Sequence, residues 1–122
     1  MAHEIINSIR AKSTIRVVGN TATTITLSDL SADPTVETVT EAAISQVSAT
    51  TDGVWRVYRG NDASGVLILE LPNYAHFVLY EFDVSFANSA TSNVYITNSG
   101  TAGTLIMQMA KTATYNPPLE GM

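Results

Sequence analysis

Apolar and polar residues alternate along much of this chain, and this two-residue period limits the fold more than any other feature. The clearest run is "YAHFVLYEFDVSF" (74–86). One face of the run would carry His76, Val78, Tyr80, Phe82, Val84 and Phe86. Successive side chains of a β-strand point to opposite faces, whereas a helix repeats every three or four residues. The run therefore predicts a half-buried strand.

Shorter alternating runs lie on the N-terminal side of this strand. Residues 13–19 and 20–29 both alternate, and the Gly19-Asn20 pair between them predicts a β-hairpin. Residues 35–50 fit both a helix and a strand, but their many threonines favour a strand.

A second hairpin is expected after "TTDG" (50–53), whose Asp-Gly pair is typical of a turn. Its loop would be "GNDASG" (60–65), and its return strand would run over 66–71 and end at Pro72-Asn73. The return strand is apolar on both faces apart from Glu70. This pattern predicts burial on both sides, either within a sandwich or against a neighbouring subunit.

The first strand of this hairpin mixes aromatic and basic residues in "GVWRVYRG". Alternation places Trp55 and Val57 on one face and Arg56 and Tyr58 on the other, and we expect Trp55 to lie in the core. Arg56 and Tyr58 would then form an outward contact with an acidic, partly apolar protein surface. Alternatively, Arg56 pairs with Glu70 across the hairpin.

The C-terminal part of the chain predicts two further strands. "VYIT" is a short strand, "NSGTAG" is a turn, and "TLIMQMAKTATY" is the last strand, with Leu105, Met107 and Met109 on one face. The chain therefore contains about eight short strands with turn signals every 8–12 residues or so. We expect one all-β domain over 13–115, folded as a β-sandwich or jelly roll.

The two ends differ from this pattern. Residues 1–12 are predicted to be an N-terminal arm, with an edge strand of the domain as the alternative, and 116–122 to be an extended C-terminal tail because of Pro117 and Pro118. We expect both arms and the hairpin to contact other proteins. The expected interface residues are Ile5, Ile6, Ile9, Arg10, Arg56, Tyr58, Arg59, Tyr115, Pro117, Pro118 and Leu119.

Charge and composition argue against several function classes. The formal net charge is −5, which opposes binding to the phosphates of DNA or RNA. Cysteine is absent, which removes disulfides and thiolate chemistry. No apolar run approaches the length of a membrane span, and the first residues do not resemble a signal peptide. We expect a protein made in a cytoplasm, with no membrane partner.

Candidate catalytic residues are few. Glu81 and Asp83 share one strand face, as paired carboxylates in a glycosidase do, but adjacent acids on a solvated face are far commoner. His76 lies on the apolar face of its strand and is expected to be a hydrogen-bonded core residue. The other histidine, His3, has no partner at metal-ligand spacing. We expect no enzyme activity, cofactor or metal site.

A succession of segments resembles a known group of proteins. The segments are "STIRVVGNTATTITLSDLSAD", "ETVTEAAISQV", "GVWRVYRG", "GVLILELP" and "GTAGTLIMQMAKTATY". Together they resemble small virion proteins of tailed bacteriophages, over most of residues 13 to 115. The resemblance implies a decoration or cement protein on the outer surface of the capsid. Its partners would be the major capsid protein and copies of itself, expected as a homotrimer.

Other function classes stay open at this point. A tail-fibre or carbohydrate-binding module would use the same sandwich with an exposed aromatic platform. A head–tail connector component is a further structural alternative. A hydrolase that uses Glu81 and Asp83 is the third.

Overall fold

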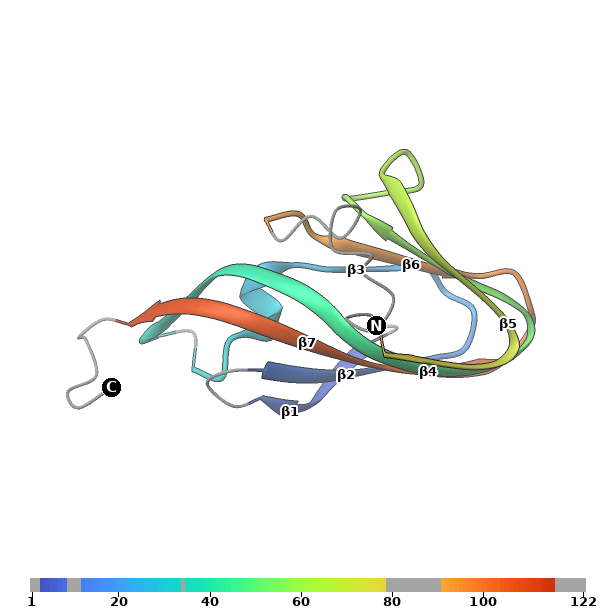
Figure 1. The fold of residues 1–122 in the computed structure, drawn as a ribbon, viewed down its shortest axis with the longest axis horizontal. Helices are drawn as coiled ribbons and strands as arrows, with labels where there is room; N and C mark the ends of the chain where they lie inside the picture. The colour runs from blue at the N-terminus through green and yellow to red at the C-terminus, as the bar shows by residue number, and fades with distance from the viewer. Residues whose placement is uncertain (1–2, 9–11, 34, 79–90, 116–122) are drawn as a thin grey trace.

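The computed structural model describes residues 3–8, 12–33, 35–78 and 91–115, apart from the side chains of residues 7 and 76–78. This part of the chain is almost entirely β-structure (Figure 1). Its elements are β1 (His3–Ser8), β2 (Lys12–Val18), β3 (Thr23–Ile25), the 3-10 helix η1 (Leu27–Leu30), β4 (Glu37–Arg59), β5 (Val66–Val78), β6 (Val94–Asn98) and β7 (Gly103–Tyr115). The predicted all-β fold is confirmed.

The strands form one antiparallel sheet that curls into two layers. Its order is β1-β2-β7-β4-β6-β3, and β5 pairs with β4 outside this path. The N-terminal part of β4 pairs with β7, and its C-terminal part pairs with β6, so this strand belongs to both layers. Figure 1 shows the layer with β3 and β6 facing the layer with β7 and β2. We call the layer with β1, β2 and β7 the first layer and the layer with β3 and β6 the second layer.

The sheet passes from one layer to the other at a corner around Asp52 and Gly53. The Asp52 carboxylate accepts hydrogen bonds from the backbone N–H of Thr101 (2.8 Å) and Ala102 (3.2 Å) and from the Thr101 hydroxyl (2.5 Å). The Thr101 hydroxyl is the largest of the causes that lower the pKa of Asp52. A Cβ on Gly53 would lie 2.3 Å from the backbone nitrogen of Gly100, so the two backbones meet too closely for a side chain.

Two predicted strand ends lie at this corner, and both are wrong. The Asp-Gly pair at 52–53 does not reverse the chain, because β4 continues through it for 23 residues in all. In the same way β5 continues through Pro72 and Asn73, and Asn73 adopts a positive φ of 54°. Both positions coincide with a register shift between β4 and β5. Turn residues here bend two long paired strands, as β-bulges do.

The predicted hairpin between β2 and β3 is wrong. β2 lies between β1 and β7, whereas β3 pairs with β6 in the other layer. Gly19 has a positive φ of 95° and its N–H donates to the carbonyl of Gly103 (2.9 Å), so the chain is held at the beginning of β7. From there it crosses to the second layer instead of folding back on β2.

Residues 3–8 form an edge strand, which is the alternative to the N-terminal arm. β1 pairs antiparallel with β2 and has a register shift next to Ile6. Ile5 packs against the core, whereas Ile6 is exposed. The predicted interface residues Ile9, Arg10, Pro117, Pro118 and Leu119 lie outside the described residues.

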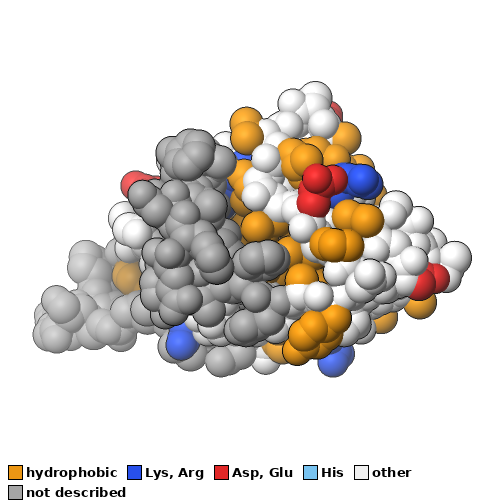
Figure 2. All heavy atoms as spheres, turned by 45° about the vertical axis from the view of Figure 1, so that its right-hand side comes forward, with side chains coloured by type: hydrophobic (Ala, Val, Ile, Leu, Met, Phe, Trp, Pro, Cys, Tyr) orange, Lys and Arg blue, Asp and Glu red, His pale blue; other side chains and the backbone are white. Residues whose placement is uncertain are grey.

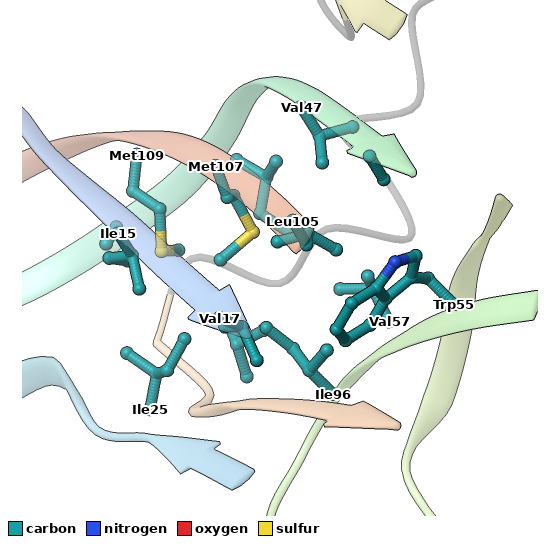
Figure 3. Packing of buried hydrophobic residues seen from close by; sticks show 14 of the residues in the cluster. Ile15, Val17, Ile25, Val47, Trp55, Val57, Ile96, Leu105, Met107 and Met109 are labelled. Carbon is teal, nitrogen blue, oxygen red and sulfur yellow. The ribbon is translucent and has the colours of Figure 1, made fainter. Parts of the chain in front are cut away.

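The core fills the space between the two layers (Figure 3). Trp55 and Val57 point inward from β4, and the indole N–H of Trp55 donates to the carbonyl of Thr50 (2.9 Å). Leu105, Met107 and Met109 of β7 are fully buried. Both predicted sets of inward-facing residues are therefore confirmed.

Within this chain, the strand 66–71 is not buried on both sides as predicted. Val66 is 57% exposed and Leu67 is 42% exposed, whereas Leu71 is buried. Among the described residues β5 pairs with β4 alone, so it lies at an edge of the second layer. In this strand Leu71 is buried in the core, and Ile68 and Leu69 are partly buried against it.

Candidate protein interfaces

Arg56 and Arg59 lie on opposite faces of β4 and have different environments. Arg59 was predicted to be an interface residue, but it is buried beside Trp55 and Val57 on the inner face of β4. Its guanidinium donates to the carbonyl of Ala42 (3.0 Å) and to that of Ser92. Burial lowers the pKa of Arg59 to about 10, so it stays charged at neutral pH. Arg59 therefore connects the two layers and does not contribute to a surface site.

A second buried charge, Lys111, ties the end of the first layer together. Its ammonium donates to Glu37 Oε1 (3.2 Å), to the Leu30 carbonyl (2.6 Å) and to Ser8 Oγ (3.0 Å). The Tyr115 hydroxyl donates to Glu37 Oε2 (2.9 Å). Tyr115 was predicted to be an interface residue, and in the structure its hydroxyl supports this cluster.

The Glu37 carboxylate is stabilised inside this cluster. Burial by itself would raise its pKa, but hydrogen bonds from the Ala32 N–H, Tyr115 and Lys111, with the charge of Lys111, outweigh burial and lower it. Both side chains of the Glu37–Lys111 ion pair are almost completely buried. The pair is therefore structural.

The outer face of the second layer carries the predicted Arg56 and Tyr58. Arg56 Nε donates to Glu70 Oε2 (2.9 Å), so the predicted cross-hairpin pair is present. The two side chains keep 37% and 52% of their surface exposed. Tyr58 contacts Tyr95 of β6, with ring centroids 5.9 Å apart.

This surface, the second-layer face, consists of Val54, Arg56, Tyr58, Leu67, Glu70, Pro72, Tyr95 and Thr97. Directly opposite residues of antiparallel strands share a face, so these side chains form neighbouring rows. In the view of Figure 2, hydrophobic side chains surround an acidic side chain that lies beside a basic one. Large apolar and aromatic groups around a few charges are typical of protein interfaces.

The outer face of the first layer carries a second apolar surface, the first-layer face, defined by Val18, Ile106 and Tyr74. Ile106 lies opposite Arg16 on β2, and Tyr74 lies opposite Thr50 on β4. Val18, Ile106 and Tyr74 are 55%, 40% and 77% exposed. The exposed Ile6 of β1 lies at the edge of the same layer.

Several of these residues were missed at the level of the sequence. Val18, Leu67, Tyr74, Tyr95 and Ile106 were not predicted to be interface residues. For Val18 and Ile106 a signal existed, because each is an apolar residue on the polar face of an alternating strand. Tyr95 joins Tyr58 only through the pairing of β4 with β6, which no local pattern indicates.

The catalytic alternatives gain no support from this part of the molecule. Glu81, Asp83 and the side chain of His76 lie outside the described residues. Within 3–8, 12–33, 35–78 and 91–115, no three His, Asp or Glu side chains gather to bind a metal ion. In the same ranges no helix is long and apolar enough to cross a membrane.

Comparisons with known proteins add little to this geometry. No family model matches the chain, and no curated protein matches it. Among solved structures the chain is similar to a proposed mannose-6-phosphate isomerase from Ralstonia eutropha JMP134, with a TM-score of 0.39 and 10% identity over 89% of this chain and 82% of that chain. A likeness at this level says nothing about activity, ligands or partners.

Proposed function

We propose that this protein is a non-enzymatic structural component of a tailed-bacteriophage virion that binds the outer surface of the capsid and stabilises it. The sequence resemblance to small virion proteins over residues 13 to 115 supports this proposal. The major capsid protein is the partner, and the protein is located on the capsid surface after assembly in the host cytoplasm.

The observation that carries the proposal is the first-layer face. Three large apolar side chains stand exposed on one face of the sheet, and Tyr74 keeps 77% of its surface open to solvent. Val18 and Tyr74 lie in one row with Thr104 and Thr50 between them, and exposed apolar groups gathered on one face in this way mark contact sites for other proteins. Tyrosine also adds rigid contact area at a small entropic cost. The first-layer face is therefore the surface that we assign to the capsid.

Binding to heads tests the proposal. Purified protein is mixed with heads that lack it and sedimented, and we expect it to cosediment and saturate at a fixed ratio to the major capsid protein. Exchanging Tyr74 and Ile106 together for Ala should weaken binding by about 2–4 kcal/mol if they are central anchors. The melting temperature should change little, because both side chains are exposed.

Val66→Ala is the matched control, since Val66 is exposed to a similar degree but lies at an edge of the other layer. This variant should bind heads like the wild type. Absence of cosedimentation, or equal binding by the Tyr74/Ile106 variant, would contradict the proposal.

A carbohydrate-binding module is the second candidate, and one observation favours it. Tyr58 and Tyr95 lie next to each other on the second-layer face, beside the polar Arg56 and Glu70. Aromatic rings beside hydrogen-bonding groups suit a sugar. Glycan-array binding that is lost in Tyr95→Ala would support this candidate instead. A protein located only at the portal vertex would favour the connector alternative.

A further inference from the structure

We propose that the second-layer face binds a second copy of this chain, about a twofold axis that passes between Arg56 and Glu70. The inference concerns the face opposite the one assigned to the capsid. It rests on the arrangement of side chains on β4, β5 and β6 and not on the identity of the capsid partner.

The pairing of the strands arranges the second-layer face in three rows. In the central row Glu70 lies opposite Arg56. The row on one side contains Leu67, Tyr58 and Tyr95, and the row on the other side contains Pro72 opposite Val54. Bulky groups therefore lie on one side of an ion pair and smaller apolar groups lie on the other.

This arrangement is complementary to itself. Two copies related by a twofold axis present the same patch to each other, so each feature must meet its complement. An axis between Arg56 and Glu70 places each Arg56 over the partner's Glu70. With this axis parallel to the strands, the same rotation places Tyr58 over the partner's Leu67 and Val54 over the partner's Pro72, so apolar groups meet apolar groups on both sides of the charges.

Charge also favours a second copy as the occupant of this face. The chain has a formal net charge of −5, so two copies repel each other over most approaches. The second-layer face carries one positive and one negative side chain, joined at 2.9 Å. Two such faces brought together in the twofold arrangement attract each other, because each positive group meets a negative one.

Charge exchange provides the test. Arg56→Glu leaves two acidic groups on the face, and Glu70→Arg leaves two basic groups. Each variant alone should dimerise at least about tenfold more weakly than the wild type in sedimentation equilibrium at low ionic strength. An equimolar mixture of the two should restore dimers. In the mixed dimer one chain has two acidic groups and the other has two basic groups, so both contacts across the interface join opposite charges.

Two further variants make the test specific. Arg16→Glu removes the exposed Arg16–Glu4 pair of the first layer, with the same change of charge, and should leave dimerisation unchanged. Leu67→Ser changes no charge and should weaken dimerisation. Thermal melts of all variants establish that they are folded.

Restoration in the mixture supports the twofold arrangement, since neither loss of folding nor a different protein partner produces it. A wild-type chain that stays monomeric at high micromolar concentration overturns the inference. A trimer, which the sequence led us to expect, overturns it as well, and so does a mixture that remains monomeric. Failure of head binding alone contradicts the proposed function and leaves the dimer intact.

Discussion

At the scale of single residues, Trp55 is the largest fully buried side chain between the two layers. We expect Trp55→Ala to lower the free energy of unfolding by roughly 3–5 kcal/mol, because it leaves a large cavity and removes the hydrogen bond of the indole N–H to the Thr50 carbonyl. Urea denaturation followed by circular dichroism measures the loss. Arg56→Ala is the control from the same strand, with an expected loss below about 1 kcal/mol. Comparable losses in both variants would mean that the strand faces are assigned incorrectly.

The ion pair of Lys111 with Glu37 leads to a second residue-scale prediction. Lys111→Met should destabilise the fold by about 3–5 kcal/mol at pH 7, because it leaves the Glu37 carboxylate buried without its cation. Adding Glu37→Gln to Lys111→Met should recover part of this loss. A double variant less stable than Lys111→Met would contradict this explanation.

The same pair predicts a dependence on pH. The pKa of Glu37 is lowered in the folded protein, so its contribution to stability is present above the ordinary carboxyl pKa of about 4 and is lost as the pH falls through the lowered value. Lys111→Met removes the charge that helps to lower this pKa. The difference in stability between wild type and Lys111→Met should therefore shrink from pH 7 to pH 4, which melts at both pH values can measure.

At the scale of elements, β1 is the strand whose role changed most between sequence and structure. Deleting residues 1–8 should lower the melting temperature by several degrees. The deletion removes the pairing with β2, the packing of Ile5, the Ser8 hydroxyl that Lys111 contacts and the bond of His3 Nδ1 to Thr23 Oγ1 (2.6 Å). Ile6→Ser is the control and should melt like the wild type. An unchanged melting temperature after the deletion would indicate a loosely attached arm.

The elements also show which features the local sequence predicts and which it does not. The inward residues Trp55, Leu105 and Met107 were predictable, because alternation depends only on the backbone of one strand. The same alternation places Arg59 inward, but its charge led to a surface assignment. Strand pairing was not predictable: a Gly-Asn pair fits a hairpin, yet β2 pairs with β7 across about ninety residues of sequence. The candidate faces depend on this pairing and therefore become visible only in the folded chain.

At the scale of the whole molecule, the predicted all-β sandwich is correct because the period of two and the regular turn signals limit the possible architectures. The prediction of about eight short strands is less accurate, since β4 alone contributes 23 residues to two layers. A bend that keeps both strands paired looks like a turn in the sequence. The corner around Asp52 differs from a hairpin only through its contacts with Thr101 and Ala102, which lie about fifty residues away.

The central position of β7 has a consequence for the time at which this protein can fold. Synthesis proceeds from the N-terminus, yet β2 and the first half of β4 find their shared partner only when residues up to Tyr115 have left the ribosome. Such non-local pairing makes folding slow, and until then two strand edges stay open to other chains. We expect the first layer to close after translation and not during it, so that prematurely ended chains aggregate and do not reach assembly.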